Sequence, residues 1–155
     1  MIKLGDKVED RFSSFKGTAI QRVTFLNRCR RYNVMADKLK DGESKHEWID
    51  EIHLDPNPPT LTGVPYPVGE SVKDSITGFS GVATAIMEVL NGNIRVLITS
   101  KTKTDRDSQP LELWFDVERL GKKVSEKVFK EFAKVPTGGP ASSPKHDVPK
   151  SSFKM

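Results

Sequence analysis

The sequence predicts a mostly β protein made of two tandem small barrels, one short C-terminal helix and an extended arm. Three observations lead to this prediction. The stretch Leu4–Ala19 returns 64 residues later as Val68–Ala83. Each copy holds short runs of β-forming residues that are separated by turn residues. After the second copy, apolar residues recur at helical spacing, and a segment rich in Pro, Ser, Gly and Lys follows.

The internal duplication is extensive. Between positions 4–34 and 68–98, nine of 31 residues are identical without a gap, whereas unrelated segments would match at roughly two positions. Self-similarity at this period indicates two copies of one structural unit. The residues that define the repeat are Gly5, Asp10, Phe15, Gly17 and Trp48 in the first copy and Gly69, Asp74, Phe79, Gly81 and Trp114 in the second.

The first copy, residues 1–54, is predicted to contain four short strands. Gly17 stands where a strand resumes after a turn, as expected at a bulge or at a positive φ. The repeated Asp10 is expected to cap backbone N–H groups in that turn. After the first short strand at 7–12, strands are expected at 18–26, 31–34 and 47–52, with a long polar loop at 37–45.

The second copy, residues 68–120, shows the same pattern more clearly. Asn91-Gly92 is the preferred pair for a tight hairpin turn. Ile94, Val96 and Ile98 alternate with more polar residues, as in a strand with one buried face. Strands are expected at 82–90, 94–98 and 113–117, with a polar loop at 99–110.

Three further segments complete the predicted organisation. The linker, residues 55–67, holds five of the ten prolines, so it should be extended and semi-rigid. A short amphipathic helix is expected at 121–135, because Val124, Val128 and Phe132 form an apolar stripe with lysines around it. Residues 136–155 are expected to form a flexible basic arm.

The short strands, the glycine after the first turn and the closing aromatic strand make each copy resemble an SH3-like or KOW-type barrel. The resemblance rests on Gly5, Val8 and Gly17 and on their counterparts 64 residues later. The patterns Leu-Gly-Asp-x-Val-x-Asp and Thr-Gly-Phe-x-Gly also resemble small tailed-bacteriophage proteins. That resemblance implies a phage origin and supplies no catalytic residues.

Composition limits the classes of protein that fit. The chain is 35% hydrophobic and 30% charged, which suits a folded polar protein. No apolar run approaches the roughly 18 residues of a membrane span, and no signal peptide is recognised at the start. A single cysteine, Cys29, excludes an internal disulfide. We expect a location in the virion or the host cytoplasm, without membrane contact.

The net charge of +4 is unevenly distributed. Residues 1–120 sum to −1, and residues 121–155 carry +5. A nucleic-acid-binding fold usually concentrates Lys and Arg on its folded face, so nucleic acid ranks below protein as a partner. The candidate contacts for nucleic acid or another anion are Arg28, Arg30, Arg31 and Tyr32.

No catalytic or metal-binding pattern is recognised. Three histidines and Cys29 match no zinc spacing, and no phosphate loop or nucleophile motif is present. Asp10 and Asp74 recur without a repeated His, Lys or Ser that could act with them. We therefore expect no enzyme activity, no metal and no cofactor.

The function that the sequence favours is a non-enzymatic structural or assembly protein of a phage, such as a capsid decoration or a head or tail accessory protein. The alternatives are a KOW-like nucleic-acid-binding or host-takeover factor, and a protein that sequesters a small anionic nucleotide signal. The partners would be other virion or phage proteins. The predicted partner-binding residues are Val124, Val128, Phe132 and Phe153.

Overall fold

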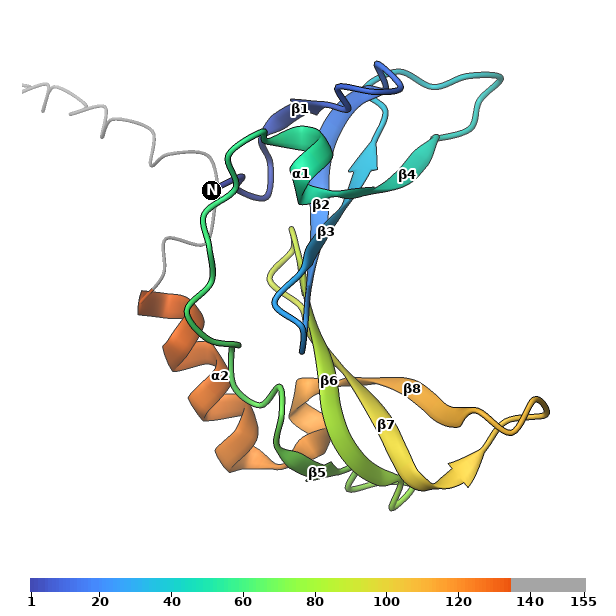
Figure 1. Cartoon of the computed structure of the whole chain (residues 1–155), viewed down its shortest axis with the longest axis vertical. Helices are drawn as coiled ribbons and strands as arrows, with labels where there is room; N and C mark the ends of the chain where they lie inside the picture. Colours follow the sequence, from blue (N-terminus) through green and yellow to red (C-terminus); the bar gives the residue numbers. More distant parts are fainter. Residues whose placement is uncertain (135–155) are drawn as a thin grey trace, which may run out of the picture.

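The computed structural model describes residues 1–134, whose strands form one antiparallel sheet (Figure 1). The path through the sheet is β4-β3-β2-β6-β7-β8, with β1 beside β2 and β5 beside β6. The predicted arm and Phe153 lie outside the described residues. The elements are β1 (Lys7–Glu9), β2 (Lys16–Phe25), β3 (Arg30–Met35), β4 (His46–Asp50), α1 (Glu51–Leu54), β5 (Ser71–Lys73), β6 (Ser80–Val89), β7 (Ile94–Thr104), β8 (Pro110–Asp116), the 3-10 helix η1 (Val117–Leu120) and α2 (Lys122–Lys134).

The two copies share this sheet and do not form the two separate barrels that the repeat predicts. β2 pairs with β6 over residues 21–25 and 85–89. Val23 lies opposite Met87, its own equivalent in the repeat, so a pseudo-two-fold axis passes between these residues. The sheet curls as a half-barrel, with the two copies on either side of this junction (Figure 1). The pairing gives one edge of β2 and one edge of β6 a hydrogen-bonded partner, so neither edge is left open there.

Gly17 and Gly81 occupy equivalent positions, at the close approach of a neighbouring strand. A β-carbon on Gly17 would lie 2.1 Å from the backbone oxygen of Met35, and one on Gly81 would lie 2.0 Å from that of Thr99. A bulge follows each glycine within the same strand. Glycine is therefore required at both positions because a side chain would not fit. The backbone angle is not the reason, since neither residue has a positive φ.

The repeated aspartates organise the turns after β1 and β5. Asp10 accepts a hydrogen bond of 2.9 Å from the backbone N–H of Phe12. Asp74 accepts two bonds, of 2.8 and 2.7 Å, from the guanidinium of Arg119. His53 takes the place of Arg119 in the first copy, with its Nδ1 3.8 Å from Asp10. The hydrogen bond from Phe12 lowers the pKa of Asp10. The two hydrogen bonds from Arg119 lower the pKa of Asp74 by more.

Several elements differ from the sequence prediction; β1, for example, ends at Glu9 and the predicted strand continues to residue 12. β7 extends through Thr104, so part of the predicted loop at 99–110 is strand; threonines at 99, 102 and 104 suit an extended backbone. β4 ends at Asp50 and the short helix α1 replaces the last two residues of the predicted strand. The change at Glu51 has a tertiary cause, because its side chain turns inward to pair with Arg30.

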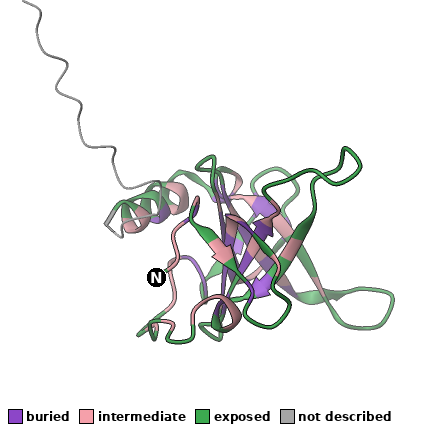
Figure 2. Cartoon of the chain, turned by 90° about the horizontal axis from the view of Figure 1, so that it is seen from above, coloured by how far each residue is buried: buried purple, intermediate pink, exposed green. Residues whose placement is uncertain are grey.

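Helix α2 packs on the core of the second copy. Val128 is fully buried there, and Val124 and Phe132 are half-buried against the same cluster. The stripe predicted to bind a partner is therefore used within the chain. Buried residues concentrate in the strands, whereas the long hairpin loops are exposed (Figure 2). Among residues 1–134, no helix is long and apolar enough to cross a membrane.

Candidate functional sites

The structure separates the four residues predicted to contact an anion. Tyr32 is fully buried, and Arg30 is buried in an ion pair with Glu51. Arg31 projects from the opposite face of β3, and Arg28 lies exposed in the β2–β3 turn. They do not form one basic surface, because alternate residues of a strand face opposite sides of the sheet.

Charged and polar residues replace apolar core residues in the first copy. In the second copy, four inward positions of β6, β7 and η1 are held by aliphatic residues of one hydrophobic cluster. The equivalent positions of the first copy are polar and buried, although burying charge is costly unless it is paired. The corresponding pairs are Arg22 with Ile86, Arg30 with Ile94, Tyr32 with Val96, and Glu51 with Val117.

These buried groups form two linked ion pairs. Arg22 Nε donates to Glu88 Oε2 at 2.7 Å, across the junction between the copies. Arg30 Nε donates to Glu51 Oε2 at 2.7 Å, and the Tyr32 hydroxyl donates to Glu51 Oε1 at 3.2 Å. Burial raises the pKa of Tyr32 to about 12. Burial also raises the pKa of Glu88, against the opposing effect of Arg22.

The proline-rich linker is held at two points, one on this polar face and the other on helix α2. Arg30 Nη2 donates to the backbone oxygen of Pro59 at 3.1 Å. Nearer the second copy, the Tyr66 N–H donates to Glu131 of α2 at 2.8 Å, and Lys127 lies 3.9 Å from the centre of the Tyr66 ring. The linker is thus a fixed part of the fold, and hollows form on both sides of it.

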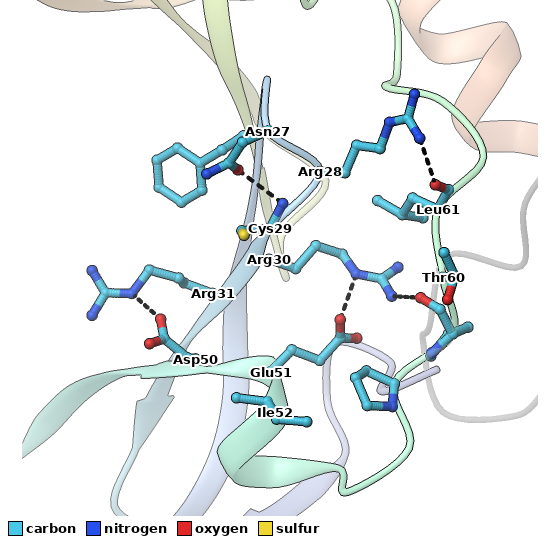
Figure 3. A pocket seen from close by; sticks show the side chains of 13 residues that line it. Asn27, Arg28, Cys29, Arg30, Arg31, Asp50, Glu51, Ile52, Thr60 and Leu61 are labelled. Carbon is cyan, nitrogen blue, oxygen red and sulfur yellow. Dashed lines mark hydrogen bonds and ion pairs between the residues drawn. The ribbon is translucent and has the colours of Figure 1, made fainter.

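One hollow, here called the linker cleft, lies between the β2–β3 turn, the start of α1 and the linker (Figure 3). Its volume is about 660 Å³. The side chain of Arg28 points toward the linker, where Nη1 lies 3.5 Å from the backbone oxygen of Leu61. The lining residues are Phe25, Asn27, Arg28, Cys29, Arg30, Arg31, Asp50, Glu51, Ile52, Pro58, Pro59, Thr60 and Leu61.

A second hollow, here called the inner cavity, lies between the linker and α2. It has a volume of about 450 Å³ and is lined in part by the buried Arg22–Glu88 pair. Arg30 and Leu61 border both this cavity and the linker cleft. The other lining residues are Met1, Thr24, Thr62, Gly63, Val64, Pro65, Glu131 and Phe132.

The third site, here called the outer hollow, lies on the opposite face of the sheet at the pseudo-two-fold axis. Val23 and Met87 form its floor, and Trp48 and Trp114 stand on either side. The tryptophans occupy equivalent positions, since β4 pairs with β3 as β8 pairs with β7. Phe25 and Arg31 complete the lining of this hollow of about 240 Å³.

Charged pairs flank the outer hollow in both copies. Arg31 Nε lies 2.7 Å from Asp50, and Arg95 Nε lies 3.3 Å from Asp116. These pairs are partly exposed, and the repeat relates them to one another. The outer face therefore presents the same aromatic and charged groups twice.

The buried charges at Arg22, Glu51 and Glu88 are not among the residues predicted from the sequence. The repeat offers a clue to Arg22. Its equivalent 64 residues later is Ile86, an apolar residue expected to face the core, so Arg22 should face inward as well. The strand predicted at 47–52 includes Glu51, whereas the residue begins α1 and its side chain turns inward. Within residues 1–134, no group of three or more His, Cys, Asp or Glu side chains is arranged to hold a metal.

Comparisons with known proteins supply no relative: no family model, no curated protein and no solved structure matches the chain.

Proposed function

We propose that this chain is a non-enzymatic interaction protein whose partner surface is the outer hollow. The observation that carries the proposal is the position of Trp48 and Trp114 on either side of the pseudo-two-fold axis. Trp48 is 41% exposed although it is a large aromatic residue. Tryptophan and arginine are enriched among the residues that dominate binding energy at protein interfaces.

The partner that the observations favour is a second copy of the chain. A face that repeats its own chemistry about an axis can meet the same face of another copy, as in the isologous contacts of most homodimers. Each half of the face carries one basic and one acidic side chain, in the pairs of Arg31 with Asp50 and Arg95 with Asp116. Both signs are thus present for complementary contacts across such an interface.

The proposed setting is the assembly of a tailed phage, as a virion or accessory component. This setting derives from the resemblance of the Leu4–Asp10 and Thr77–Gly81 patterns to small phage proteins. We also propose that each copy descends from an SH3-like unit that fused with its duplicate. Detection of the chain by mass spectrometry in purified particles, compared with infected-cell lysate, tests the setting.

The other predicted functions have less support. Nucleic-acid binding ranks lower because Arg30 and Arg31 are each matched to a carboxylate, so few charges remain for a phosphate chain. Catalysis ranks lower because Asp10 and Asp74 are engaged in turn contacts. Sequestration of a small anion has one specific observation in its favour, the linker cleft.

The test of the interface is the oligomeric state of the full chain, measured by sedimentation at several concentrations. We expect the wild type to dimerise and Trp48→Lys to remain monomeric, since the new charge would have to be desolvated. Phe12→Lys is the matched control, because Phe12 is 74% exposed in the turn after β1, outside the outer hollow.

Circular dichroism should show the same fold for both variants. A wild type that stays monomeric at hundreds of micromolar would rule out the second copy as the partner. A Trp48→Lys protein that dimerises like the wild type would remove the outer hollow from the interface.

A further inference from the structure

The linker cleft carries an inference that does not depend on dimerisation. We propose that this cleft binds a small organic oxyanion, which is a molecule with one phosphate or carboxylate group and an apolar body, and that Arg28 pairs with the charged group. The cleft shares only Phe25 and Arg31 with the outer hollow, so each site can be tested without the other.

The charges in the cleft favour an anion. Its lining holds three arginines and two carboxylates. Arg30 is paired with Glu51 and Arg31 with Asp50, each at 2.7 Å (Figure 3). Among the described residues, Arg28 has no carboxylate partner, and the one polar contact of its side chain is the 3.5 Å bond to a backbone oxygen. A guanidinium with unused donors binds phosphate or carboxylate through two parallel hydrogen bonds.

The size and the walls of the cleft favour an anion with an organic body. A volume of about 660 Å³ lies within the range of small-molecule sites, roughly 300–1,000 Å³, and far exceeds a single phosphate. Phe25, Ile52, Pro59 and Leu61 supply apolar surface around Arg28. One unmatched arginine suits a single charged group, whereas an extended polyphosphate would need several.

The cleft is formed before any ligand arrives. Arg30 joins its two walls, because it donates to Glu51 on one side and to the Pro59 oxygen on the other. The turn that carries Arg28 is fixed by a 2.9 Å bond from the Cys29 N–H to the Asn27 side chain. A site that needs no ordering on binding loses less affinity to entropy.

The second copy supplies a variant suited to the test. Arg28 has a φ of 69°, which is unfavourable for an arginine, and its counterpart Gly92 has a φ of 90°. Arg28→Gly therefore removes the guanidinium and places there a residue that suits the turn. Arg106→Gln is the control, because it removes one exposed positive charge from the β7–β8 loop.

The experiment is calorimetric titration of the full chain with four probes: adenosine monophosphate, indole-3-carboxylate, adenosine and inorganic phosphate. We expect at least one of the two organic oxyanions to bind ten times more tightly than adenosine and inorganic phosphate. The probe that binds shows whether the charged group is a phosphate or a carboxylate. Arg28→Gly should weaken this binding by about tenfold or more, as loss of a charge-assisted hydrogen bond implies, and Arg106→Gln should leave it unchanged.

Three results would overturn the proposal. The first is no heat of binding for either organic oxyanion at millimolar concentration. The second is adenosine binding as tightly as its monophosphate while the carboxylate fails to bind. The third is equal weakening by Arg28→Gly and Arg106→Gln, which would indicate a general effect of net charge.

Discussion

At the scale of single residues, Gly17 and Gly81 determine how closely two neighbouring strands pack in each copy. They allow the backbone of the next strand to approach to a distance that any side chain would prevent. The same residue type is present in both copies because the same close approach occurs twice. Asp10 and Asp74 likewise organise equivalent turns, although only Asp74 is joined to an arginine.

Replacing either glycine with alanine should destabilise the fold. The added methyl group would meet a backbone oxygen at about 2 Å, and relief of such overpacking costs roughly 1–3 kcal/mol. We expect the urea midpoints of Gly17→Ala and Gly81→Ala to fall together. Gly63→Ala is the control, because nothing lies within 4 Å of its added atom. An unchanged midpoint in both strand variants would show that the strands can separate freely.

The pH dependence of stability should depend on Asp74 more than on Asp10. The pKa of Asp74 in the folded chain lies below its unfolded value, chiefly because Arg119 donates two hydrogen bonds. Its contribution to stability is therefore complete above the unfolded value, about 3.9, and is lost as the pH falls toward the folded value.

The test compares urea unfolding of Asp74→Asn, Asp10→Asn and the wild type between pH 7 and pH 2. We expect Asp74→Asn to lose less stability on acidification than the wild type, and Asp10→Asn to resemble the wild type more closely. The reason is that His53 lies 3.8 Å from Asp10, whereas Arg119 lies 2.7 Å from Asp74. Parallel curves for Asp74→Asn and the wild type would contradict this assignment.

At the scale of elements, the junction of β2 and β6 combines two kinds of contact. On the outer face, Val23 packs in one cluster with Ala85 and Met87. On the inner face, Arg22 pairs with Glu88 while both are buried. The apolar contacts favour association of the strands, and the ion pair requires a defined register because each buried charge needs its partner.

A double-mutant cycle separates these contributions. Glu88→Leu alone should cost about 3–5 kcal/mol, since it leaves the buried guanidinium of Arg22 without its partner. Arg22→Met combined with Glu88→Leu should be near neutral or stabilising, as for other buried pairs that are replaced by apolar residues. Chemical denaturation of the single and double variants measures both effects. A double variant less stable than either single variant would mean that the pair itself is strongly stabilising.

At the scale of the whole molecule, the continuous sheet makes the two copies interdependent. Strand β6 pairs with β2, and α2 completes the core of the second copy. The linker is hydrogen-bonded to Arg30 of the first copy and to Glu131 of α2. The chain should therefore unfold in one cooperative step.

Separation of the copies tests this cooperativity. We expect residues 1–67 expressed alone to be unfolded or self-associated, because Val23 would lose its cover and the edge of β2 would be exposed. Residues 68–155 should be affected in the same way at β6, and mixing the two fragments should restore the fold. Far-ultraviolet circular dichroism and amide hydrogen exchange provide the measurements. A well-folded monomer of either fragment would show that the copies are separate domains.

The sequence by itself determined the features that depend on local chemistry. The duplication, most strand positions, the paired glycines and aspartates, and the helix at Lys122–Lys134 follow from residue spacing and turn preference. Strand alternation also places Tyr32 and Arg31 on opposite faces, although it does not say which face is covered.

Only the tertiary structure decided which strands meet across the repeat and what covers each face. Pairing of β2 with β6 joins residues that are 60 or more positions apart, and no local pattern specifies such a contact. That junction buries Arg22 against Glu88 and places the two tryptophans around one axis. The cleft beside Arg28 arises in the same way, because the linker lies against the β2–β3 turn once Arg30 has bound both Glu51 and the linker.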